Sequence, residues 1–187
     1  MRMLRLASLA LLVAAAAPGC SRLMGYSDAG KPAPIRDYPD GADGLKALFT
    51  DVLDAAKKDD RDRVHDLLAS TIMTDDDLTA VLGAPGTQLQ PRYHALMATL
   101  ANRGAVELVA QIYERKYDTV DVLAIDPKAK DARPEDRAVA AALTAPMPIY
   151  SVRLRRATDD KGLRYDFFFY RRGKWLTGNQ LGKFLGQ

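Results

Sequence analysis

The chain has 187 residues, of which 48% are hydrophobic and 27% charged, with 27 lysines and arginines against 24 aspartates and glutamates. This composition is that of a globular protein, and it excludes a disordered charged tail, a collagen-like repeat and a multi-pass membrane protein. The single cysteine excludes an internal disulfide and argues against a cysteine-based zinc cluster. The net charge of +3 and the pI near 9.0 would by themselves suggest an acidic partner such as nucleic acid.

The first twenty residues are typical of an export signal. Two arginines lie within the first five residues, an apolar run follows from Leu6 to Ala17, and Pro18 and Gly19 precede the cysteine. The apolar run is too short to cross a bilayer, which needs about 20 residues. The pattern therefore predicts a signal peptide over residues 1–19.

The segment Ala17-Pro18-Gly19-Cys20 resembles the lipobox of bacterial lipoproteins. In that family the cysteine thiol is joined to a diacylglycerol, and a peptidase then cuts before the cysteine. The resemblance implies that Gly19 is the last residue before the cut and that Cys20 carries the lipid. Two or three acyl chains would hold the protein stably on a membrane. Ser21, in a position where aspartate often marks inner-membrane lipoproteins, implies the periplasmic face of the outer membrane if the host is Gram-negative.

Removal of the predicted signal peptide would lower the net charge of the chain. Residues 1–19 contain two arginines and no acid, so the mature chain has a net charge of only +1. We therefore expect no nucleic-acid partner. The expected partners are the membrane, through the N-terminal lipid, and another protein of the cell envelope.

Residues 20–42 are predicted to be the lipidated cysteine and a flexible tether, because glycine and proline recur there without an apolar period. The remaining residues, 43–187, are long enough for a single domain. Apolar spacing over 44–58 predicts an amphipathic helix with Asp43 as its N-cap. Val64, Leu67 and Leu68 indicate a second helix, and Thr74 is placed to cap a third that Gly83 ends.

A fourth helix is predicted to begin at Pro91, a residue favoured in the first helical position, and to end at Gly104. The next stretch, 105–116, fits both a helix and an alternating strand, and we favour the helix. A strand is expected over 119–125 because of its β-branched residues. A short helix is expected over 134–143.

The C-terminal third predicts an antiparallel meander. Residues 149–157 and 163–170 alternate in polarity, and tight turns at 159–162 and 171–173 lead into a third strand at 174–177. The predicted fold class is therefore α+β, with N-terminal amphipathic helices packed on the meander. In this alternation Leu163 and Tyr165 share a face with Phe167 and Phe169, while Phe168 lies on the opposite face.

This succession of elements, with Phe169-Tyr170 followed by Gly173-Lys174-Trp175, resembles the nuclear-transport-factor-2-like (cystatin-like) superfamily. The resemblance implies a cone-shaped α+β fold in which a curved sheet wraps a helix around a pocket. Some members of that superfamily are enzymes and many are binding modules. No enzyme motif of the superfamily can be matched to residues of this chain, so the resemblance assigns no catalytic residue.

Few residues of the sequence stand in patterns that are typical of catalysis or metal binding. The two histidines, His65 and His94, lack metal-ligand spacing, and no phosphate-binding, Rossmann or nucleophile-elbow motif is present. The acidic run Asp75-Asp76-Asp77 lacks the rest of a calcium loop and is better explained as charge at a helix N-terminus. We therefore expect no catalytic residue, no metal and no cofactor.

Two features of the meander are candidates for function. Arginines cluster there, and they form either a surface for an anionic partner or a solvated face balanced by Asp159, Asp160 and Asp166. Aromatic residues on both faces require a covering helix, a pocket or a partner. The candidate residues for a pocket or partner face are Tyr150, Asp166, Phe168, Tyr170 and Trp175.

The sequence leaves three functional hypotheses. The first is a lipid-anchored, non-enzymatic protein of the cell envelope that acts in binding or assembly. The second is a small enzyme or ligand-binding protein with a pocket, in which Tyr150, Asp166, Tyr170 or His94 supply the polar groups. The third is a structural component that pairs with another protein through its sheet. A deep pocket with a buried carboxylate or histidine would favour the second hypothesis.

Overall fold

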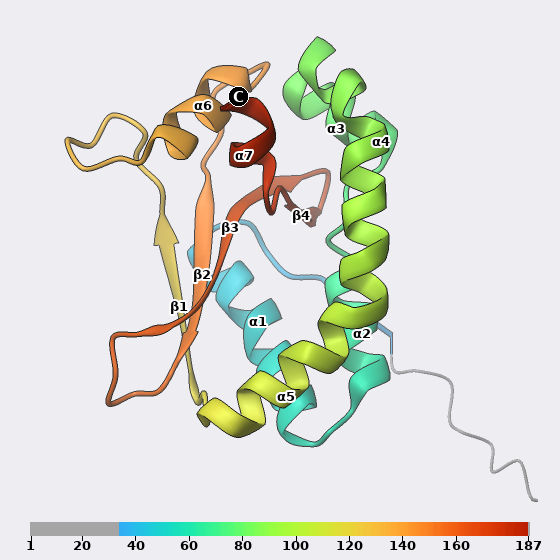
Figure 1. The fold of residues 1–187 in the computed structure, drawn as a ribbon, viewed down its shortest axis with the longest axis vertical. Helices are drawn as coiled ribbons and strands as arrows, with labels where there is room; N and C mark the ends of the chain where they lie inside the picture. The colour runs from blue at the N-terminus through green and yellow to red at the C-terminus, as the bar shows by residue number, and fades with distance from the viewer. Residues whose placement is uncertain (1–33, 187) are drawn as a thin grey trace, which may run out of the picture. The chain divides into compact units, whose positions relative to one another are not determined.

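A computed structural model describes residues 34–186, so Gly19, Cys20 and the predicted signal peptide lie outside the described part. Within residues 34–186 the chain forms seven α-helices, one π-helical segment and four β-strands (Figure 1). The helices are α1 (Ala42–Lys57), α2 (Arg61–Ala69), α3 (Asp75–Leu82), α4 (Ala84–Thr99), α5 (Ala105–Arg115), α6 (Pro134–Ala142) and α7 (Leu181–Leu185), with the π-helix η1 (Leu100–Gly104) between α4 and α5. The strands are β1 (Thr119–Ala124), β2 (Tyr150–Arg155), β3 (Gly162–Arg171) and β4 (Lys174–Thr177).

The four strands form one antiparallel sheet in the order β1-β2-β3-β4. The predicted meander is confirmed, and the strand expected over 119–125 joins its outer edge. At the opposite edge the segment between α2 and α3 lies against β4, where the Thr177 N–H donates to the Thr71 carbonyl at 2.7 Å. The α+β fold class is therefore as the sequence predicts.

The first three helices form where the apolar spacing places them. The cap of α3 is as predicted, because the Thr74 hydroxyl accepts from the Asp77 N–H and the Asp77 carboxylate accepts from the Thr74 N–H. The predicted cap of α1 is wrong. Gly41 precedes that helix without a side-chain cap, and Asp43 lies in the first turn, where its charge suits the helix dipole.

The largest error of the sequence prediction concerns the middle of the chain. The fourth helix begins at Ala84 rather than at Pro91, which lies inside it, and Gly104 does not end it. Instead Gly104 has helical dihedral angles, and the chain continues through η1 directly into α5. The helical choice for 105–116 is confirmed. The start was missed because Ala84-Pro85-Gly86 has the composition of a turn.

Two apolar cores lie on opposite faces of the sheet. The first joins α1, α2 and α5 to one face, and the second joins α3, α4, α6 and α7 to the other. The neighbours Trp175 and Leu176 in β4 belong to different cores, as expected for residues that alternate across a strand. Helices cover both faces of the sheet, which is one of the three explanations for the aromatic residues there, and Phe168 also lines a pocket described below.

A β-bulge in β3 changes which residues share a face. Val152 of β2 pairs with Tyr165, and Tyr150 pairs with Phe168, so two steps along β2 correspond to three along β3. Phe167 is the residue that takes up the extra step, with a positive φ of 65°. Because of the bulge, Leu163 and Tyr165 face the first core together with Phe168, and the predicted grouping of Tyr165 with Phe167 is wrong.

Residues 34–41, at the end of the predicted tether, pack against the domain. Tyr38 is buried in the first core, and its hydroxyl donates to the Asp51 carboxylate at 2.6 Å. The indole N–H of Trp175 donates to the Pro39 carbonyl at 3.2 Å. We call residues 34–41 the N-terminal strap. The sequence did not predict this packing, nor the short helix α7.

Candidate functional site

The predicted aromatic residues come together in the first core. The rings of Tyr150 and Tyr170 both meet the Trp175 ring edge-on, with centroids 5.5 Å and 5.2 Å away. Phe168 is buried and meets Phe49 of α1 in the same manner at 5.2 Å. Tyr150, Tyr170 and Trp175 therefore form a packed aromatic cluster, and only Phe168 also lines the pocket described below.

The polar candidates lie apart from this cluster. Asp166 accepts hydrogen bonds from Arg133 at 3.0 Å and from Arg164 at 2.6 Å, so an ion-pair network occupies its carboxylate. His94 is only partly exposed, and its Nε2 lies 2.6 Å from the Asp75 carboxylate. The structure does not bring Tyr150, Asp166 and His94 together in one pocket.

Most arginines of the meander are also paired. Arg155 pairs with Asp121, Arg156 with Asp159, and Arg171 with Asp77. Arg153 donates to the backbone carbonyl of Asp160 at 3.0 Å. The pairing of arginines with Asp159 and Asp166 is what the solvated-face interpretation expects. These ion pairs leave less positive charge for an anionic partner than the number of arginines in the sequence suggests.

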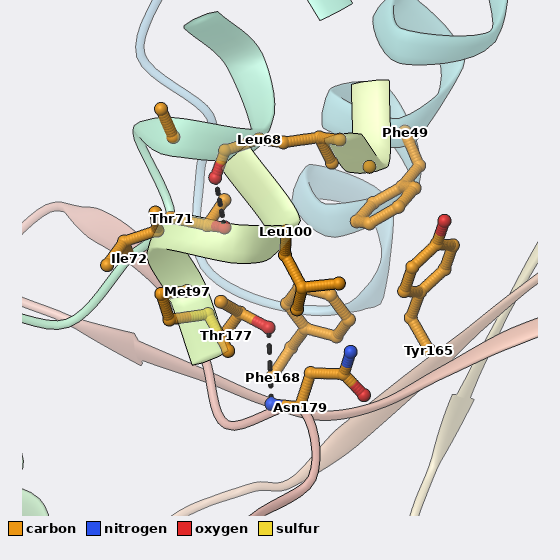
Figure 2. Close-up of a pocket in the computed structure, with 12 residues that line it drawn as sticks. Phe49, Leu68, Thr71, Ile72, Met97, Leu100, Tyr165, Phe168, Thr177 and Asn179 are labelled. Atoms are coloured by element: carbon orange, nitrogen blue, oxygen red, sulfur yellow. Dashed lines mark hydrogen bonds between the residues drawn. The ribbon is translucent and has the colours of Figure 1, made fainter. Parts of the chain in front are cut away.

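A small apolar pocket lies where α4 gives way to η1 and passes the β4 edge of the sheet (Figure 2). Its cavity volume is about 70 Å³. Apolar and aromatic side chains from five elements form most of its wall: Phe49, Leu68, Met97, Leu100, Tyr165 and Phe168. A π-helical segment inside an α-helix is uncommon and occurs often at functional sites. We call this hollow the central pocket.

A wider hollow of about 850 Å³ lies near the end of α5, but its character is different. Exposed charged side chains such as Arg115, Lys116 and Arg156 line it. Binding sites for small molecules are mostly apolar with a few placed polar groups. The walls of the central pocket fit that description better, and its volume of about 70 Å³ suits only a small group.

Three polar side chains complete the central pocket. The Thr71 hydroxyl donates to the Leu68 carbonyl at 2.7 Å, and the Thr177 hydroxyl accepts from the Asn179 N–H at 3.3 Å. Asn179 itself is half-buried, and within residues 34–186 its carboxamide has no hydrogen-bond partner. The pocket thus has mostly apolar walls, and within residues 34–186 two of its polar groups, the carboxamide of Asn179 and the hydroxyl of Tyr165, have no hydrogen-bond partner.

The electrostatics of the central pocket favour an uncharged occupant. None of its described lining residues is an acid, a base, a histidine or a cysteine. Burial, followed by the nearby charge of Glu107, raises the pKa of the Tyr165 hydroxyl well above its ordinary value, so this side chain is neutral at physiological pH. Among the described residues no group of three histidine, cysteine, aspartate or glutamate side chains is arranged to hold a metal ion.

Sequence reasoning found one residue of the central pocket, Phe168, and missed the rest. Leu68, Met97 and Leu100 lie at helical spacing in the sequence, which is typical of ordinary core positions. Nothing in the sequence marks η1, because its geometry depends on the packing of a helix that passes from one core to the other. Asn179 follows the last strand in a segment for which no element was predicted.

Comparisons with known protein families, with curated proteins and with solved structures find no match for this chain. The resemblances to bacterial lipoproteins and to the nuclear-transport-factor-2-like superfamily therefore stay predictions. No helix in residues 34–186 combines the length and the apolar character needed to cross a membrane.

Proposed function

We propose that this chain is a lipoprotein of the bacterial cell envelope whose folded domain is a binding module rather than an enzyme. Cys20 carries the lipid, and the central pocket receives an apolar group of the ligand. The observation that supports binding is the central pocket itself, a hollow of about 70 Å³ with apolar walls beside a π-helical segment.

The anchor is supported by the N-terminal sequence. An apolar run that is too short to span a bilayer precedes the only cysteine of the chain, and a small residue stands directly before that cysteine. Ser21 favours the outer membrane in a Gram-negative host, where the domain would face the periplasm.

Replacement of Cys20 by serine tests the anchor. In cells that produce the full chain, the wild-type protein is expected in the membrane fraction, with a mass increased by the lipid. The C20S variant is expected to lose the lipid mass and to leave that fraction. Retention of C20S in the membrane fraction at an unchanged mass would show that the anchor is not a lipid on this cysteine.

Xenon tests the central pocket, because it enters dry apolar cavities. The mature chain from residue 20 with the C20S substitution is labelled with ¹⁵N and titrated with xenon gas. We expect amide shifts around η1 and β4. Gly104→Leu should abolish them, because a side chain at this position occupies the pocket. Ala110→Leu on the exposed face of α5 adds the same side chain outside the pocket and serves as the control. Shifts that survive Gly104→Leu would rule out this pocket as the site.

A further inference from the structure

We infer that the central pocket selects a small neutral molecule with a short branched apolar end and one uncharged hydrogen-bonding group, which the carboxamide of Asn179 recognises. This inference rests on the proposed binding function and adds the chemical class of the ligand.

The volume limits the apolar end. An apolar cavity of about 150 Å³ is known to hold benzene, whereas the central pocket offers about 70 Å³. A branched alkyl group of about four carbon atoms is therefore the largest end that enters without rearrangement. Met97 in the wall has a flexible side chain that can adjust to the shape of such a group.

The walls disfavour a charged ligand. The described lining residues supply no counter-ion, and an ionised group without a partner is costly to remove from water. A carboxylate or an ammonium group on the buried end of the ligand would therefore bind less tightly than an amide or an alcohol of the same shape.

Asn179 supplies the recognition of the polar group. Its carboxamide has two donor hydrogens and one acceptor oxygen, which suit an amide or a hydroxyl group. Figure 2 shows this carboxamide on the side of the pocket that Phe168 and Tyr165 form. The Thr71 hydroxyl already donates its hydrogen to the Leu68 carbonyl, and the Thr177 hydroxyl accepts from the Asn179 N–H.

The loop that carries Asn179 is held in place, so the backbone position of this residue is set before the ligand arrives. The Gly178 N–H donates to the Phe167 carbonyl at 2.6 Å, directly at the bulge of β3. A Cβ atom on Gly178 would lie 2.7 Å from Leu181 and 2.8 Å from Phe169, so the loop is tightly packed from both sides. A polar side chain on a fixed loop loses less entropy on binding than one on a mobile loop.

Two probes of the same shape but different charge test the selection. The ¹⁵N-labelled mature chain with C20S is titrated at neutral pH with isobutyramide and with isobutyrate. We expect isobutyramide to bind at least about tenfold more tightly, with shifts at the same amides that xenon moves, because the anion lacks a counter-ion in the pocket.

Asn179→Leu keeps the shape of the side chain and removes the amide. We expect this variant to weaken isobutyramide about threefold to tenfold, the range of one net hydrogen bond, while xenon binding is unchanged. Asn179→Ala provides a smaller replacement with the same expectation, and Gln111→Leu removes an exposed amide on α5 as the control. Unchanged xenon shifts show that each variant is folded around an intact pocket.

The outcomes distinguish a failure of the inferred ligand class from a failure of the proposed binding function. If xenon binds but the two probes bind equally, or if both Asn179 variants bind isobutyramide as the parent does, the ligand class is wrong and the binding function stands. If neither xenon nor isobutyramide moves the pocket amides, both proposals fail. Preference for isobutyramide that is lost in both Asn179 variants supports the inference.

Discussion

Asp77 links the helical half of the chain to the sheet. Its side chain is 5% exposed, and it accepts hydrogen bonds from Lys174 at 2.8 Å and from the Thr74 hydroxyl at 2.9 Å, while Arg171 lies 3.4 Å away. Burial alone would raise the pKa of Asp77, but the hydrogen bonds from Lys174 and Thr74 outweigh it and lower the pKa below the ordinary value of 3.8.

We predict that Asp77→Asn lowers the free energy of unfolding by about 2 kcal/mol at neutral pH, because hydrogen bonds to a buried charge are lost. A pKa that is lower in the folded state stabilises the fold above pH 4, and this contribution is lost as the pH falls below 3.8. Urea unfolding at pH 7 and pH 3 should therefore show that the difference in free energy of unfolding between the wild type and the variant is smaller at pH 3. Asp76→Asn, an exposed neighbour, is the control, and an equal effect of the two substitutions would contradict the prediction.

The sequence predicts the part that Asp77 plays in the helix cap but not its contact with the sheet. Its position three residues after Thr74 and at the start of a helix indicates a capping box. Its contact with Lys174, 97 positions later, depends on how the β3–β4 hairpin folds over the start of α3. A single sequence carries no signal for that pairing.

At the level of elements, the sequence predicts those whose apolar period is uninterrupted. Helices α1 and α2 and the strands of the meander are examples, because one side of each must be buried. The errors fall where packing overrides local preference. Pro91 lacks the N–H that an interior helical position uses, yet Leu89 and Tyr93 on either side of it are buried and hold the helix in place. The bulge at Phe167 adds one residue to β3, so the alternation of side chains between the two faces of the sheet shifts by one residue after it. Composition gives no signal of this shift.

The π-helix η1 gives a prediction about glycine. Gly104 has helical dihedral angles, with φ −64° and ψ −35°, and a Cβ atom there would meet only Leu100, at 3.8 Å. Alanine lowers the entropy of the unfolded chain at no steric cost in such a position. We expect Gly104→Ala to raise the free energy of unfolding by about 0.5–1 kcal/mol in urea denaturation.

Gly178→Ala is the matched comparison, because its Cβ atom would lie 2.7 Å from Leu181. This substitution should destabilise the protein by about 1–3 kcal/mol through overpacking. If both alanine variants destabilise the protein equally, the helical geometry assigned to Gly104 is incorrect.

For the molecule as a whole, the N-terminal strap sets where the domain begins. The strap buries Tyr38, and Arg36 also pairs with Asp51 at 2.9 Å. Burial and the hydrogen bond to Asp51 raise the pKa of the Tyr38 hydroxyl to about 12, so the strap stays docked with a neutral tyrosine at physiological pH. Glycine and proline in and near these residues are typical of a tether, but they also suit an extended segment that is fixed by side chains.

The last prediction concerns the removal of this strap. A mature chain that begins at Ala42 lacks Tyr38 and the Pro39 carbonyl that accepts from Trp175. Compared with a chain that begins at Pro34, it should lose about 3 kcal/mol of the free energy of unfolding, because one buried aromatic side chain and its hydrogen bonds are removed. Trp175 is the only tryptophan and is 3% exposed, so its fluorescence reports directly on the strap. Its emission should move to longer wavelength in the shorter chain, where water reaches the indole. Equal urea midpoints and unchanged emission in the two chains would mean that the domain begins at α1 and that the strap only lies on its surface.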